Sequence, residues 1–346
     1  MKRLIFITTV ATLWTSRSLA APSTCLPVAS ETDLVAYIAA APFALKANAG
    51  MKIWETDSKE WQAARQAALA WADANCEKFV AAAQTMAYEA SLLRDATSGH
   101  SYWVLRENKN QPAYQGVFAF RAPEEVKQAR GLVIDAPHMG SDYATADGRA
   151  VRTFRDTDAV AFLQNTAHRC SLTSTSGCSP VTSSYACGEG GVRNSDVVHS
   201  IRNGYYAVYD GIESARDYYH LEYHGAGKST NASGCMGTAH ISQASSLKLT
   251  AEEDDGTWPN RFWRSMEQNL GAGCVCYHQR ESGCKLNGGA STPGRRTNAE
   301  WTQSEPPAAN ACLVSPSSLA MRFIHFEGYR VDEAAVVKAI KAAFSP

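Results

Sequence analysis

The strongest constraint on the fold is a series of short apolar runs separated by segments with helical periodicity. Residues 131–137 and 159–163 stay apolar long enough to form strands that are buried on both faces of a sheet. Shorter β-rich runs occupy residues 102–105, 117–120, 218–223 and 321–326. Strands that alternate with helices predict an α/β domain with parallel strands. We therefore expect a three-layer αβα fold with a mostly parallel central sheet, of the phosphorylase or hydrolase type, over residues 99–346.

A helical segment, residues 21–98, is expected before this domain. From residue 31 to residue 97 alanine is dense, and large apolar side chains recur at helical spacing. Asp57 or Ser58 is the expected N-cap of the longer helix in this segment. Further helices are expected at residues 196–212, 260–269 and 332–344.

The second half of the chain carries an insertion rich in Cys, Gly and Ser at about residues 225–318. Its later part, residues 283–318, is rich in Gly, Pro, Ser and Asn. This composition predicts a long surface loop, which we expect Cys284 and Cys312 to pin.

The N-terminus has the pattern of a signal peptide. Lys2 and Arg3 precede an apolar run, residues 4–14, that is shorter than the ~20 residues of a membrane-spanning helix. Small residues of the type cut by signal peptidase follow at 18–21. We expect residues 1–20 to be removed and the protein to be secreted or periplasmic; an N-terminal membrane anchor is the alternative.

All ten cysteines follow the expected cleavage site. An even number of cysteines in an exported chain predicts disulfides, although their spacing leaves the pairing open. A zinc site that uses Cys274 and Cys276 is the alternative.

The charge excludes several partners. Without Lys2, Arg3 and Arg17 the chain has 30 basic and 34 acidic residues, a net charge of −4. No basic surface for nucleic acid or anionic lipid is expected from such a balance, so we expect neither a nucleic-acid nor a membrane partner.

Three of the apolar runs end in histidine, at His138, His168 and His224. In an open α/β sheet, functional groups gather just beyond the carboxyl ends of the strands. If the three strands are parallel neighbours, these histidines can converge from distant points of the sequence. Histidine is the commonest metal ligand in proteins, so this pattern points to a metal site.

Two acidic residues extend the pattern. Asp142 follows His138 by four residues across a Gly-containing turn, so one segment can offer both an imidazole and a carboxylate. Two histidines and one carboxylate with an open position are typical of catalytic zinc. Glu327 ends the last apolar run, where it can act as a general base beside a metal. The alternative is structural: His138 caps the strand, and Asp142 and Glu327 are solvated acids at turns.

These residues resemble the zinc carboxypeptidase-type amidohydrolases, and within that clan the poly-γ-glutamate hydrolases and, more loosely, the N-formylglutamate amidohydrolases. The resemblance rests on Ala-Pro-His138 with an acid shortly after it, on Tyr-His224-Gly and on Phe-Glu327, and covers about residues 131–344. It implies that His138 and His224 bind Zn²⁺, that Asp142 stands where those enzymes have a ligating glutamate, and that Glu327 is the general base. The Gly-rich stretch after Gly225 and the helical N-terminal segment lie outside it.

A second polar cluster is expected near the same pocket. His168 and Arg169 follow a strand and are further catalytic candidates, and Arg193, Asp196 and His199 are weaker candidates for substrate binding. A guanidinium near a hydrolytic metal selects a substrate with a carboxylate, and Asp196 and His199 can orient a metal ligand. The alternative is that Asp196 caps a helix and His199 faces the core. His240 is a similar but weaker candidate, and His325, two residues before Glu327, can approach the same pocket.

The sequence thus predicts a zinc-dependent hydrolase of an amide bond in a small or peptide-like substrate that carries a carboxylate. Two alternatives stay open. One is a metal-free serine hydrolase that uses Ser195 or Ser229, although no Gly-x-Ser-x-Gly motif is present. The other is a secreted binding protein on a hydrolase-like scaffold.

Overall fold

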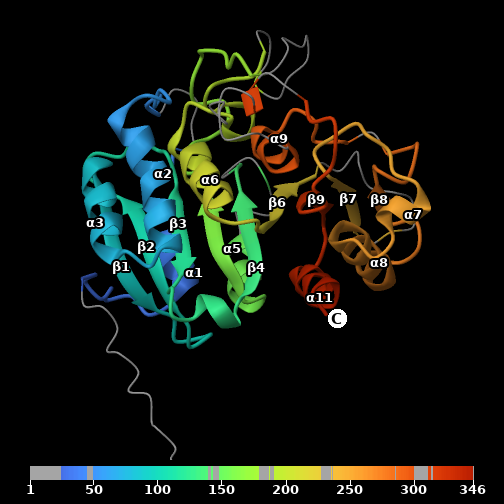
Figure 1. Cartoon of the computed structure of the whole chain (residues 1–346), viewed down its shortest axis with the longest axis horizontal. Helices are drawn as coiled ribbons and strands as arrows, with labels where there is room; N and C mark the ends of the chain where they lie inside the picture. The colour runs from blue at the N-terminus through green and yellow to red at the C-terminus, as the bar shows by residue number, and fades with distance from the viewer. Residues whose placement is uncertain are drawn as a thin grey trace, which may run out of the picture.

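A computed structural model of the chain describes residues 25–44, 50–138, 142, 148–178, 187, 191–226, 235, 237–284, 286–299, 311–312 and 315–345. Within these residues the chain forms an α/β fold around one nine-stranded sheet (Figure 1). The α/β class is therefore as the sequence predicts. The expected signal peptide lies outside the described residues.

The nine strands form a mixed sheet. In chain order they are β1 (Tyr88–Arg94), β2 (Ser101–Glu107), β3 (Val117–Arg121), β4 (Arg130–Ala136), β5 (Ala159–Gln164), β6 (Tyr219–Gly225), β7 (Thr238–Ser242), β8 (Val275–Tyr277) and β9 (Phe323–Tyr329). Their order across the sheet is β1-β2-β3-β5-β4-β6-β9-β7-β8. The central strands β5, β4, β6 and β9 are parallel. Strands β7 and β8 at one edge are also parallel, whereas the pairings of β1 with β2, β2 with β3, β3 with β5 and β7 with β9 are antiparallel. The sheet is therefore mixed, and the expectation of a mostly parallel sheet holds at its centre and at the β7–β8 pair.

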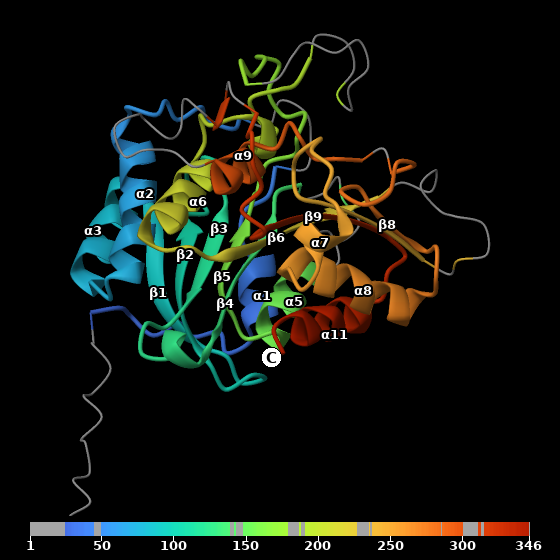
Figure 2. The ribbon, with the colours of Figure 1, turned by 45° about the vertical axis from the view of Figure 1, so that its right-hand side comes forward.

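Helices lie on both faces of the sheet (Figures 1 and 2). They are α1 (Leu34–Ala39), α2 (Lys59–Ala72), α3 (Cys76–Thr85), α5 (Arg149–Asp156), α6 (Gly204–Ala215), α7 (Ala251–Asp254), α8 (Trp258–Leu270), α9 (Thr292–Asn298) and α11 (Glu333–Ala343), with 3₁₀ turns η1 (Val126–Gln128) and η2 (Val197–His199). One hydrophobic cluster joins α2, α3 and α6 to the sheet, and a second joins α1, α5, α8 and α11 to it. Strands β3 and β5 are buried along their whole length, because helices cover both of their faces.

The N-terminal segment is not entirely helical. Ser58 is the N-cap of α2, as expected, and accepts a hydrogen bond from the Trp61 amide. The expectation of helix is wrong at β1, which pairs with β2 along all seven of its residues. Its adjacent residues Leu92 and Leu93 enter the two opposite hydrophobic clusters, which only an extended chain allows. Helix α2 lies directly on α6, where a Cβ on Gly211 would come within 2.5 Å of the Arg65 carbonyl oxygen.

Two other expectations need correction. The helix expected at residues 196–212 is divided into η2 and α6, because Asn203 caps a new helix by accepting a hydrogen bond from the Tyr206 amide. The segment 283–318 is not a surface loop throughout, since it contains α9, most of whose side chains are buried. Residues 285, 300–310 and 313–314 of this segment lie outside the described residues.

Five disulfides pair all ten cysteines, as the sequence predicts. The pairs are Cys25–Cys76, Cys170–Cys187, Cys178–Cys312, Cys235–Cys274 and Cys276–Cys284. Because Cys274 and Cys276 are each oxidised, they cannot be thiolate ligands, and the alternative of a zinc site there is wrong. Disulfides of this number are typical of proteins in oxidising compartments. None of the helices in the described part of the chain has the length and apolarity needed to cross a membrane.

Candidate metal centre

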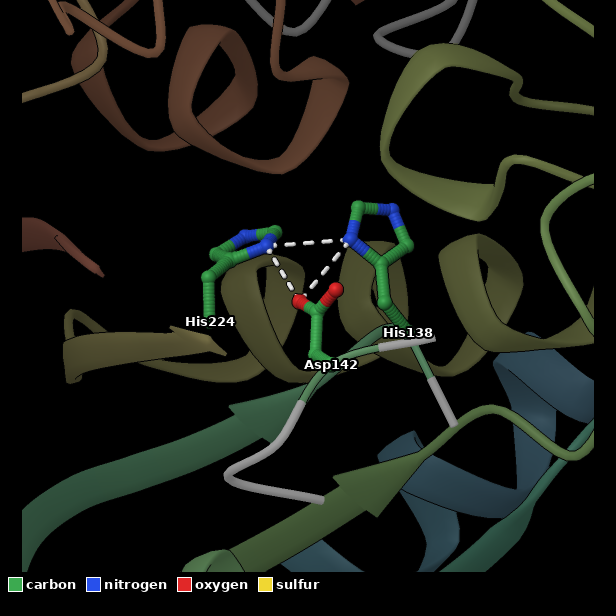
Figure 3. Close-up of side chains that lie close together, drawn as sticks. All are labelled: His138, Asp142 and His224. Carbon is green, nitrogen blue, oxygen red and sulfur yellow. Dashed lines mark hydrogen bonds and ion pairs between the residues drawn. The ribbon is translucent and has the colours of Figure 1, made fainter. Parts of the chain in front are cut away.

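The carboxyl ends of β4 and β6 bring two histidines together. His138 comes two residues after β4, and His224 is the penultimate residue of the neighbouring parallel strand β6. Asp142 lies on the loop that follows His138, and its amide donates a hydrogen bond to the His138 carbonyl. The three side chains point toward one another (Figure 3). They are 1%, 6% and 5% exposed for His138, Asp142 and His224, so water has little access to them.

The three side chains form a nearly equilateral triangle of potential ligand atoms. The Nδ1 atoms of His138 and His224 are 3.0 Å apart, and they lie 3.3 and 3.2 Å from Asp142 Oδ2. With zinc–ligand bonds of about 2.0–2.1 Å and tetrahedral angles, ligand atoms lie roughly 3.3 Å apart. The triangle therefore fits one face of a tetrahedral zinc site and leaves the fourth position open.

Each histidine is oriented by a buried carboxylate on its other ring nitrogen. His138 Nε2 lies 2.9 Å from Asp196 Oδ1, and His224 Nε2 lies 3.0 Å from Glu222 Oε1. Both carboxylates are fully buried. Carboxylates in this position fix the ring orientation of metal-binding histidines and raise their basicity.

The hydrogen bonds around Asp196 show which nitrogen of His138 can bind a metal ion. Burial opposes ionisation of Asp196, but His199, Arg169 and His138 together hold the pKa of its carboxyl well below the usual value. Arg169 Nη2 lies 3.2 Å from Asp196 Oδ2 and 3.1 Å from His138 Nε2. The ionised Asp196 carboxylate can only accept, so His138 Nε2–H donates to its Oδ1 at 2.9 Å and Arg169 donates to its Oδ2. The contact of Arg169 Nη2 with His138 Nε2 then joins two donors and is not a hydrogen bond. The Nδ1 lone pair of His138 is then directed at the triangle.

The negative charges around His224 favour the protonated form of its ring or, in its place, a bound metal ion. Burial lowers the pKa of His224, but the hydrogen bonds that His224 donates to Asp142 and Glu222, together with their negative charges, outweigh it and raise this pKa to about 10. Burial likewise opposes ionisation of Asp142, yet His138 and His224 hold the pKa of its carboxyl far below the usual value. Without a metal, His224 therefore keeps a proton on each ring nitrogen between the carboxylates of Asp142 and Glu222. A metal ion that binds here takes the place of the proton on Nδ1.

A cavity of about 300 Å³ opens over the triangle. Glu327 lines this cavity and pairs with His224 across the parallel strands β6 and β9, so the two side chains emerge at the same level of the sheet. His325, two residues earlier on the same face, places Nε2 3.5 Å from Glu327 Oε1. Residues 286–291 form a further wall of the cavity.

The structure brings some of the candidates of the second cluster to the cavity and leaves others away from it. Arg169 and His199 line the cavity, and Asp196 lies behind His138. His168 is not part of the lining, and its Nδ1 accepts a hydrogen bond from the Cys170 amide. Arg193 is also outside the lining and donates to the Thr173 carbonyl.

The weaker histidine candidate His240 and the serine candidate Ser195 do not line the cavity. His240 pairs with Glu327 in the register of β7 and β9 but is not among the residues that line the cavity. Ser195 is fully buried and donates its hydroxyl hydrogen bond to the Arg169 carbonyl, so it is not presented as a nucleophile. Ser229 lies outside the described residues.

Sequence reasoning missed Glu222, Ser291 and the wall at residues 286–290. For Glu222 a signal was available, because Glu222 and His224 are two residues apart on a strand and hence share one face. Ser291 and the wall had no such signal, since they are brought to the site by the path of a segment without regular periodicity.

The donor set narrows the choice of ion. Two imidazoles and one carboxylate suit zinc and its neighbours among the transition metals better than magnesium or calcium, which prefer oxygen ligands. Two other groups of potential ligands compete less well. Glu222, His224 and His325 would use the His224 nitrogen that already donates to Glu222. The group of Cys276, Glu281 and Cys284 contains two disulfide-bonded sulfurs.

Comparisons with known proteins do not assign this site. The sequence matches no protein-family model, and a search of curated proteins finds no similar sequence.

Proposed function

We propose that the chain is an exported zinc-dependent hydrolase that cleaves an amide bond near a carboxylate. The observation that carries this proposal is the triangle of His138 Nδ1, Asp142 Oδ2 and His224 Nδ1, with edges of 3.0–3.3 Å, beside a cavity that also holds Glu327. Such a triangle leaves room for a substrate oxygen or a water molecule at the fourth position.

The reaction needs a base and a proton carrier. A bound zinc ion would supply Lewis-acid polarisation of the amide carbonyl and would make water more acidic. Glu327 accepts a proton from the attacking water as the water oxygen bonds to the carbonyl carbon. It then donates this proton to the amide nitrogen as the C–N bond breaks, so the products are an amine and a carboxylic acid, which loses its remaining proton to solvent at neutral pH. Its side chain lines the cavity and is 20% exposed, which leaves it accessible for both transfers.

Arg169 is the proposed anchor for the substrate carboxylate. It lines the cavity, and its pairing with Asp196 holds the guanidinium in place. Guanidinium groups form strong, charge-assisted bonds to carboxylates. A cavity of about 300 Å³ admits a small substrate or the end of a chain.

The resemblance to zinc carboxypeptidase-type amidohydrolases, nearest to poly-γ-glutamate and N-formylglutamate hydrolases, agrees with this proposal. We propose that the catalytic unit is a three-layer αβα domain to which the N-terminal helices are added, and that the leader at residues 1–20 directs export. Five disulfides support an oxidising compartment.

A steady-state assay with N-acyl and γ-glutamyl substrates tests the function, with metal analysis of the same sample. Glu327→Gln should keep one zinc per chain and lower kcat by about 10²- to 10⁴-fold, because it removes a positioned base and keeps the side-chain size. Glu89→Gln, on the edge strand β1 and outside the cavity lining, is the matched control and should keep full activity. Unchanged turnover of Glu327→Gln with zinc present would remove Glu327 from the mechanism. Zinc binding without turnover of any substrate would favour a binding protein.

A further inference from the structure

Both oxygens of Glu222 are engaged. Glu222 is fully buried in the middle of β6, and its Oε1 lies 3.0 Å from His224 Nε2. Its Oε2 lies 3.0 Å from the hydroxyl oxygen of Ser291, which belongs to the cavity wall at residues 286–291. This one carboxylate therefore connects the metal triangle to the wall.

The Ser291 hydroxyl is the donor in its hydrogen bond with Glu222. Ser291 is the N-cap of α9, and its hydroxyl oxygen accepts a hydrogen bond from the Gly294 amide at 3.1 Å. A hydroxyl has a single proton, so the proton of Ser291 is available for Glu222. Glu222 therefore accepts one hydrogen bond at each of its two oxygens, from His224 at Oε1 and from Ser291 at Oε2.

The wall at residues 286–291 has two other attachments. Arg295 donates to the Gly289 carbonyl at 2.9 Å. Gly288, with a φ of +60°, brings its backbone against the ring of His325, where an added Cβ would lie 2.8 Å from Cγ. The bond between Ser291 and Glu222 links this wall to the metal ligand His224 through hydrogen bonds, whereas Gly288 reaches His224 through ring packing, since the His325 and His224 ring centroids are 4.6 Å apart.

We propose that Ser291 is a positioning residue that acts through Glu222 and couples the metal triangle to the cavity wall at residues 286–291. The proposal rests on the metal site of the proposed function. Ser291 and His224 share one carboxylate, so an ion that fixes the His224 ring also fixes Glu222 and, through it, the wall. Conversely, loss of the Ser291 hydroxyl leaves Glu222 Oε2 buried without this partner and free to turn away from His224.

Zinc affinity in a double-mutant cycle tests the coupling, measured by competition with a chromophoric chelator. Glu222→Gln should weaken zinc binding by about 10- to 100-fold, and Ser291→Ala by roughly tenfold, as expected when groups behind metal ligands are lost. Because Ser291 acts through Glu222, the double variant should bind zinc no more than about twofold more weakly than Glu222→Gln alone. Ser58→Ala removes the same type of helix cap from α2, away from the site, and should bind zinc like the unaltered protein.

Hydrogen exchange gives a second readout. Zinc should slow exchange in the peptide that covers residues 286–291 of the unaltered protein, and this effect should be lost in Ser291→Ala.

Several outcomes would overturn the coupling. These are unchanged zinc affinity in Ser291→Ala, an equal loss in Ser58→Ala, multiplicative losses in the double variant, or zinc protection of the wall that survives Ser291→Ala. Failure of the folded, unaltered protein to bind zinc would instead overturn the proposed function, and the coupling with it.

Discussion

Zinc should stabilise the folded chain, because the ligand triangle exists only when β4 and β6 lie side by side. His138 and His224 are 86 residues apart in the sequence, so the unfolded chain does not present a formed site. A ligand that binds only the folded state contributes about 2.7 kcal/mol when it is present at 100 times its dissociation constant. For a 346-residue chain the entropy of unfolding is about 0.7 kcal/mol per kelvin, and the melting temperature should therefore rise by about 4 °C.

The measurement is a thermal melt followed by circular dichroism. The protein is freed of metal with a chelator and melted alone and with zinc, magnesium or calcium at equal concentration. Zinc should give the rise, and magnesium and calcium should give almost none, because two imidazoles are poor ligands for them. His224→Ala should abolish the zinc effect. His100→Ala is the control, since His100 contacts Glu125 and Asp158 outside the triangle, and it should keep the effect.

The reasoning fails if zinc leaves the unaltered protein at the same melting temperature while saturating it. It also fails if His224→Ala shows the full rise, because the stabilising ion would then bind elsewhere. A rise of equal size with magnesium would mean that the ligands are oxygens.

Two further predictions concern the fold that supports the site. His220 is buried between Asp135 and Glu213; burial lowers its pKa, but the two carboxylates outweigh this and raise the pKa to about 9. Because this pKa is higher in the folded than in the unfolded chain, protonated His220 stabilises the fold. The stabilisation is complete below the pKa of the unfolded chain, about 6.5, and is lost as the pH rises through about 9. The loss amounts to about 3 kcal/mol in the free energy of unfolding. Urea denaturation should give a lower free energy of unfolding at pH 10 than at pH 6, and His220→Gln should not show this fall. An equal fall in His220→Gln would mean that a group other than His220 causes the pH dependence. All ten cysteines should be oxidised, so thiol titration of the denatured, unreduced protein should find no free thiol, and several per chain would refute the pairing.

Much of the secondary structure could be predicted because its signals are local. The apolar runs at 131–137 and 159–163 became β4 and β5, and a strand covered by helices on both faces must be apolar at nearly every position. The oxidised state of the cysteines followed from their even number and the expected export. Tyr88–Arg94 was misread as helix, because a dense alanine pattern nearby continued into it and the free edge of β2 decided its conformation.

The residues of the candidate site also fall into two groups: those that the local sequence indicates and those that only the tertiary structure brings together. The sequence by itself determined that His138 and His224 end apolar strands and that Asp142 and Glu327 lie within reach of strand ends, since these are relations between neighbours along the chain. Only the tertiary structure decided which residues meet: strand order brings His224 beside His138, and a connection of 58 residues brings Asp196 behind it. The role of a carboxylate depends on which nitrogen lies 3 Å away, and that distance is set by the packing of strands and loops that no local pattern encodes.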